Sequence, residues 1–141
     1  ADYEEMLRRA VCVSADVRAA LDPTFPEVHD PRNAARMNCG VCLTKYTGAR
    51  GKGGTNDASA ETLSYVTNVF DDAGVAWQTG ELGKVDQGGG GTIAKFVSNR
   101  NVDTVDIGVP MLSMHAPFEL VAKQDVLMTY RAFLAFATAK Q

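Results

Sequence analysis

Apolar residues along this 141-residue chain recur in two alternating patterns, which predict strands and helices in turn. Nearly continuous apolar runs, typical of strands within a sheet, occupy residues 11–16, 41–46, 75–80 and 104–112. Apolar residues at helical spacing occupy residues 2–10, 57–73, 92–99 and 122–139. Strands that alternate with helices predict one α/β domain, with a mostly parallel sheet and helices on its faces.

Some of these elements carry more detailed signals. The run at residues 11–16 is continuously apolar, so we expect this strand to be buried on both faces. Asn56 or Asp57 can cap the helix that follows, and Gly74 can end it, because glycine readily adopts the left-handed conformation after a helix. The last helix is apolar at positions 126, 127, 130, 133, 134 and 136.

One polar segment and two glycine-rich segments connect the elements. Residues 22–36 are rich in Pro, Asp and Asn, so we expect a loop there with His29 at the surface. Residues 47–56 are expected to form a flexible loop that either presents Arg50 and Lys52 to an anion or is merely a turn. The glycines at 88–91 precede a helix, so their N–H groups either face a ligand or form a tight connection.

Composition excludes several classes of protein. The hydrophobic fraction of 45% and the charged fraction of 22% are those of a globular domain. A net charge of −3 favours neither nucleic acid nor an anionic membrane as a partner. No apolar stretch reaches the roughly 20 residues that a transmembrane helix needs. The chain lacks an initiator Met and opens in a helical pattern, which indicates processing or a segment of a longer chain.

Three cysteines have no spacing of a disulfide framework, which favours a reduced, cytoplasmic protein. Cys39 and Cys42 form a C-x-x-C motif. Redox motifs of this kind open a helix, whereas Cys42 lies in a predicted strand. A zinc knuckle would need a second pair of ligands, which the sequence lacks. We therefore interpret the motif as two buried small residues.

Asp16 and His115 each follow a predicted strand, and both side chains can bind a metal. In open α/β sheets, ligands bind beyond the carboxyl ends of the strands, so these two positions can meet in one crevice. A carboxylate oxygen and an imidazole nitrogen are a common ligand set for Zn²⁺. Each residue also has a structural interpretation, Asp16 as a turn residue and His115 as a core histidine. Their matching placement makes a shared, though incomplete, metal site as good an interpretation as the two structural ones.

Four ordered segments together cover nearly the whole chain. They are SADVRAALDP at residues 14–23, YTGARGKG through to residue 58, GGGTI at 89–93 and DIGVPMLSMHAP at 106–117. These segments resemble the aspartyl aminopeptidase / aminopeptidase I family of zinc peptidases. The resemblance implies a site with two zinc ions, in which Asp16 and His115 are terminal ligands of different ions. It also implies that the substrate pocket is bordered by Arg50, Lys52, Gly90, Gly91 and Thr92.

The resemblance further implies that residues 1–141 are the C-terminal portion of a catalytic domain with a zinc-exopeptidase fold. The family's other metal ligands and its general base lie earlier in its chain, as does an inserted domain that builds oligomer contacts. We therefore expect a fragment of a metalloaminopeptidase that acts on peptides and is inactive alone. Its expected partners are the rest of the domain and further subunits of a homo-oligomer. A non-catalytic α/β assembly or binding domain is the alternative, and a nucleotide- or anion-binding module is a weaker one.

Overall fold

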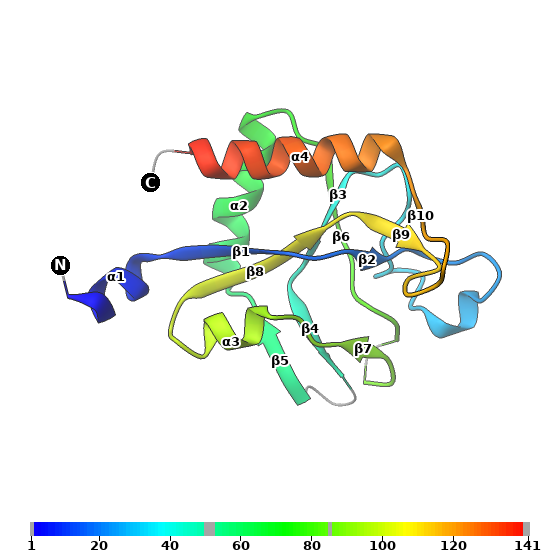
Figure 1. Cartoon of the computed structure of the whole chain (residues 1–141), viewed down its shortest axis with the longest axis horizontal. Coiled ribbons are helices and arrows are strands. Elements are labelled where there is room, and N and C mark those ends of the chain that lie inside the picture. Colours follow the sequence, from blue (N-terminus) through cyan, green and yellow to red (C-terminus); the bar gives the residue numbers. More distant parts are fainter. Residues whose placement is uncertain (1, 50–52, 85, 140–141) are drawn as a thin grey trace.

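The computed structural model describes residues 2–49, 53–84 and 86–139. In this part of the chain, a four-stranded sheet has the order β1–β8–β3–β6 (Figure 1). Its strands are β1 (Val11–Ala15), β8 (Asp103–Gly108), β3 (Val41–Thr44) and β6 (Trp77–Thr79). β1 is parallel to β8 and β3 is parallel to β6, whereas β3 is antiparallel to β8. The predicted α/β class, with a mostly parallel sheet flanked by helices, is confirmed.

Helices lie on both sides of this sheet (Figure 1). α2 (Ala60–Asp72) and α4 (Lys123–Thr138) contact each other and pack on β8 and β3, respectively. The short α3 (Ala94–Ser98) contacts β8 from the other side, and α1 (Tyr3–Arg9) precedes β1. Apolar side chains of α2, α4 and the sheet form the core between them: Val41, Leu43, Ala58, Val66, Phe70, Val75, Val105, Ile107, Met128 and Ala132. No helix within the described ranges is long and apolar enough to cross a membrane.

Two smaller sheets extend the fold. β4 (Tyr46–Ala49) pairs antiparallel with β5 (Gly53–Asp57) and with β7 (Gly89–Gly90). β9 (Pro110–Leu112) pairs with β2 (Arg18–Ala19) and β10 (Leu120–Val121), and a short 3₁₀ helix covers Pro26–Val28. The predicted strand at 104–112 is therefore two strands in different sheets. The predicted flexible loop at 47–56 was also wrong, because most of it forms the hairpin of β4 and β5.

Several local predictions need correction. β1 is an edge strand, so its first three residues are only half-buried and the prediction of burial on both faces was wrong. α2 begins after Ser59, whose hydroxyl accepts the N–H of Thr62 at 3.1 Å, and not after residue 56 or 57. The predicted end of this helix is confirmed, because Gly74 has φ +63°.

Two side chains lie in environments that the sequence did not indicate. His29 is buried, not at the surface, and its Nε2 accepts the N–H of Asp22 at 3.4 Å. Cys42 is buried as predicted, but Cys39 is exposed. Burial raises the pKa of the Cys42 thiol to about 12, so this thiol stays protonated near neutral pH.

The start of α4 is fixed by a buried carboxylate. Asp125 is fully buried, and its two oxygens accept the N–H groups of Asn38 at 2.7 Å and of Gly40 at 2.8 Å. Asn38 and Gly40 have φ of +64° and +92°, so the carboxylate accepts the N–H groups of a turn that leads into β3.

The opposite face of α4 is exposed and carries the apolar residues Val126, Leu127, Tyr130 and Leu134.

Candidate functional site

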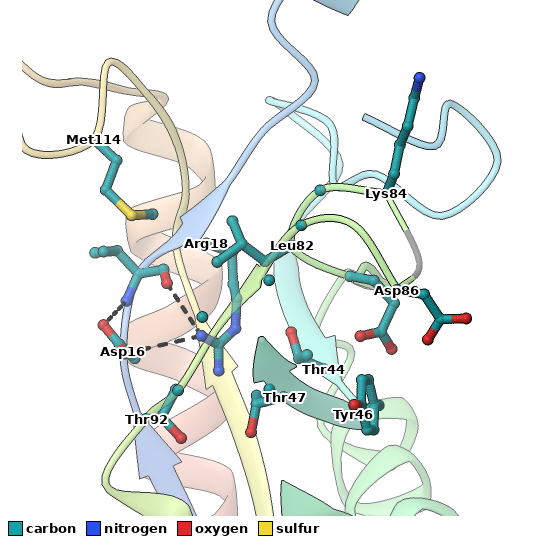
Figure 2. Close-up of a pocket in the computed structure, with 18 of the residues that line it drawn as sticks. Asp16, Arg18, Thr44, Tyr46, Thr47, Leu82, Lys84, Asp86, Thr92 and Met114 are labelled. Atoms are coloured by element: carbon teal, nitrogen blue, oxygen red, sulfur yellow. Dashed lines mark hydrogen bonds and ion pairs between the residues drawn. The ribbon is translucent and has the colours of Figure 1, made fainter. Parts of the chain in front are cut away.

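A cavity of ≈ 180 Å³ lies where β1, β3 and the β8–β9 segment end (Figure 2). Both predicted metal ligands, Asp16 and His115, line it. So do the predicted substrate-binding residues Gly90, Gly91 and Thr92. The structure therefore brings together residues from widely separated parts of the sequence. The other two predicted substrate residues, at positions 50 and 52, lie outside the described residues.

Asp16 is held by tight backbone packing at the end of β1. Its N–H donates to the carbonyl of Ile107 at 3.0 Å, and its Oδ1 accepts the N–H of Val17 at 2.7 Å. Gly108 packs directly against it, since a Cβ at position 108 would lie 1.3 Å from the Asp16 carbonyl oxygen. The carboxylate is 44% exposed, so it is fixed at its base and accessible at the cavity.

His115 lies in a tight turn after β9. Ser113 and His115 have φ of 58° and 68°, a left-handed conformation that costs a residue other than glycine roughly 1–2 kcal/mol. The N–H of His115 donates to Oε1 of Glu119 at 2.7 Å, which stabilises the turn. A strained backbone conformation persists only where the surrounding structure holds it in place, and such residues are most common at functional sites. His115 is exposed, so the interpretation as a core histidine is wrong.

Arg18 lines the cavity and belongs to a charged network that the sequence did not indicate. Arg18 is 6% exposed and Asp106 is fully buried, and their Nη2 and Oδ1 atoms are 3.3 Å apart. Nη1 of Arg18 lies 3.9 Å from Oδ2 of Asp16, and Thr92 donates its hydroxyl to Oδ2 of Asp106 at 3.0 Å. An acidic residue inside the apolar run 104–112 was the signal that could have revealed this network.

Glu81 is a second cavity residue that the sequence did not single out. Burial raises its pKa to about 7, against an ordinary value of 4.5, although a backbone hydrogen bond from Tyr46 and the charge of Arg18 oppose the shift. This carboxyl group therefore titrates near neutral pH beside the cavity.

Within the ranges that the structure describes, no three side chains of His, Cys, Asp or Glu are grouped so that they could hold a metal ion. Asp16 and His115 supply one oxygen and one nitrogen donor to one cavity, which suits part of a zinc site.

Comparisons with known proteins identify the family. Residues 1–137 match the family model described as aminopeptidase I zinc metalloprotease (M18). The chain belongs to the M18 family. The predicted resemblance is therefore confirmed, and membership of a family described as zinc metalloproteases supports zinc as the predicted cofactor.

Relatives in this family are much longer than the chain. A probable M18 family aminopeptidase 1 of Thermotoga maritima is 51% identical over 130 residues, which are 92% of this chain and 29% of the relative. The crystal structure of an M18 aminopeptidase from Thermotoga maritima has a TM-score of 0.90 at 50% identity, and the match covers 94% of this chain and 29% of that chain. Aminopeptidase I of Clostridium acetobutylicum has a TM-score of 0.92 at 43% identity, over 96% and 30% of the two chains. The chain thus spans less than a third of the length of these relatives.

Proposed function

We propose that this chain is the C-terminal part of the catalytic domain of a zinc aminopeptidase, which releases N-terminal residues from peptides. The observation that carries the proposal is the meeting of Asp16, His115 and the glycine-rich turn at one cavity. Membership of the M18 family supports the activity, and the coverage of the relatives supports the assignment to a part of the domain. The expected cytoplasmic location belongs to the same proposal.

Asp16 and His115 would each be a terminal ligand of a different zinc ion. Oδ1 of Asp16 is engaged by a backbone N–H, which orients the carboxylate while leaving it accessible to the cavity. Glu119 stabilises the turn at His115 by accepting the backbone N–H of this residue. The His115 imidazole does not take part in that hydrogen bond. Since these two donors do not complete a site, the remaining ligands and the general base would come from outside residues 1–141.

The other residues of the cavity would position the peptide. When bound, zinc polarises a scissile carbonyl and makes hydroxide available near neutral pH. Gly90 and Gly91 would leave room for the substrate backbone; a Cβ at position 90 would meet Leu82 at 2.8 Å, so a larger residue would crowd the cavity. Thr92 would border the same pocket. Thr92 is supported by its hydrogen bond to Asp106, which fixes the turn.

The proposal also includes protein partners. β1 and β6 are the edge strands of the main sheet, and α4 exposes Val126, Leu127, Tyr130 and Leu134. Uncovered strand edges and apolar faces favour pairing with another segment. The rest of the catalytic domain and further subunits of a homo-oligomer would cover them.

A chimera tests the proposal directly. Residues 1–137 replace the matching segment of the Thermotoga maritima aminopeptidase, and zinc content and hydrolysis of aminoacyl-anilides are measured. We expect zinc-dependent activity that is lost in Asp16→Ala and His115→Ala and kept in Asp72→Ala, an exposed control at the end of α2. If the two ligand variants bind zinc as the parent chimera does, the ligand roles are wrong and the non-catalytic alternative gains support.

A further inference from the structure

A buried ion pair connects Arg18, which lines the cavity, with Asp106 in β8, and stability does not explain it. Arg18 and Asp106 are both more than nine-tenths buried, and their closest charged atoms are 3.3 Å apart. Burying two charges is costly, and apolar residues in place of such a pair often leave a protein equally stable or more stable. Within the part of the chain that is described, Nε and Nη2 of Arg18 and Oδ1 of Asp106 make no well-aligned hydrogen bond, so the pair is not optimised for stability.

Both partners reach toward the site residues. Nη1 of Arg18 donates to the carbonyl of Val17 at 3.3 Å and lies 3.9 Å from Oδ2 of Asp16 (Figure 2). The guanidinium therefore faces the carboxylate oxygen that does not accept the N–H of Val17. A fixed positive charge on that side limits rotation of a carboxylate that is otherwise exposed to the cavity.

The other end of the pair holds the glycine-rich turn. Oδ2 of Asp106 accepts the hydroxyl of Thr92 at 3.0 Å, and the same hydroxyl accepts the N–H of Ala94 at 3.2 Å. Thr92 thus joins the buried charge to the last turn before α3. One continuous set of contacts connects Asp16 at the end of β1 with the turn that follows Gly91.

We propose that Arg18 and Asp106 are positioning residues, which orient the Asp16 carboxylate for its metal and tie it to the Thr92 turn that borders the substrate. This inference rests on the proposed function, because it assigns Asp16 to a metal and the turn to the substrate. Replacing a residue that contacts and orients a metal ligand commonly lowers the metal affinity about 10–100-fold. A role in stability alone predicts no such change.

The test uses the same chimera and separates positioning from folding. In the double variant Arg18→Met with Asp106→Leu, both charges are removed together, so no unpaired charge stays buried. We expect the zinc affinity, measured by competition with a chelator, to fall about 10–100-fold while the melting temperature stays at or above that of the parent. Arg18→Lys keeps the charge without the planar fork, so we expect it to retain more zinc affinity than the double variant.

Two further variants complete the design. Thr92→Val removes only the hydroxyl that contacts Asp106, and we expect it to raise KM more than it lowers kcat. Asp125→Asn alters a buried carboxylate that does not line the cavity, so it should lower the melting temperature and leave zinc affinity unchanged. The inference is overturned if the double variant and Arg18→Lys both bind zinc within about twofold of the parent. Loss of zinc affinity in Asp125→Asn as large as in the double variant also overturns it. If Asp16→Ala keeps the parent's zinc affinity, the ligand role of Asp16 in the proposed function is wrong, and the inference that depends on it is overturned as well.

Discussion

Replacing Gly108 with alanine should displace the proposed metal ligand Asp16 without touching its side chain. A Cβ at Gly108 would lie 1.3 Å from the carbonyl oxygen of Asp16 and 2.4 Å from its carbonyl carbon, both backbone atoms. Contacts of a real Cβ are essentially never shorter than 3.0 Å, so the separation from that oxygen must more than double. Because Asp16 and the C-terminal end of β8 are joined by a backbone hydrogen bond, this movement also disturbs the end of the sheet.

The magnitude follows from how strongly catalysis depends on position. A displacement of 1 Å at a reacting group can lower a rate about 10²-fold, which corresponds to roughly 2.7 kcal/mol of activation free energy. We therefore expect Gly108→Ala to lower kcat/KM of the chimera at least about 10²-fold and to weaken zinc binding. The added methyl group should also lower the free energy of unfolding by about 1–3 kcal/mol, as overpacking usually does.

Steady-state kinetics, chelator competition and urea denaturation measure the three quantities on one preparation. Gly74→Ala is the matched control, because its φ of +63° strains alanine while no atom lies within 4 Å of the added Cβ. We expect this control to lose about 1 kcal/mol of stability and to keep its activity. Parent-like zinc affinity and kcat/KM in a folded Gly108→Ala variant would refute the reasoning.

Three other predictions address folding, pH dependence and assembly. Asp125→Ala leaves two N–H groups of the turn before β3 without an acceptor, the buried one of Gly40 and the partly buried one of Asn38. Urea denaturation should therefore show a loss of about 3 kcal/mol in the free energy of unfolding; a loss below about 1 kcal/mol would show that other contacts hold the turn. The pKa of Glu81 is raised to about 7 from 4.5 by burial, so the folded chain holds this proton longer than the unfolded chain. Stability should therefore fall between these two pH values as pH rises; Glu81→Gln should flatten this part of the profile in thermal melts, and an unchanged slope would contradict the assignment. The exposed apolar face of α4 should make this chain self-associate in sedimentation experiments, and Leu127→Lys with Tyr130→Lys should reduce the association; a stable monomer before mutation would count against this prediction.

The fold class and the core of the site were predictable because both depend on local patterns. The patterns that indicate strands and helices are contained in short stretches of sequence. Ligands of open α/β sheets bind beyond the carboxyl ends of the strands, so the place of the site follows from the same patterns. Asp16 and His115 therefore line one cavity, as the sequence led us to expect. Their role as metal ligands stays a prediction.

The features that the sequence did not reveal depend on distant contacts. β8 ends at Gly108, which packs against the backbone of Asp16, and β9 begins at Pro110. This contact joins residues far apart in the chain, so no short stretch of sequence reveals it. The pairing of Arg18 with Asp106 likewise joins remote segments. His29 is buried although its loop is rich in Pro, Asp and Asn, and its Nε2 accepts the N–H of Asp22 from the start of that loop.

We propose above that this chain carries only part of a zinc aminopeptidase site. Its most direct test measures zinc content and aminopeptidase activity together on residues 1–141 after dialysis against micromolar zinc. We expect little tightly held zinc and no hydrolysis of aminoacyl-anilides, because Asp16 and His115 would be only two of the ligands that the site needs. Zinc close to two ions per chain together with robust hydrolysis would contradict it and would show that the chain holds a complete site.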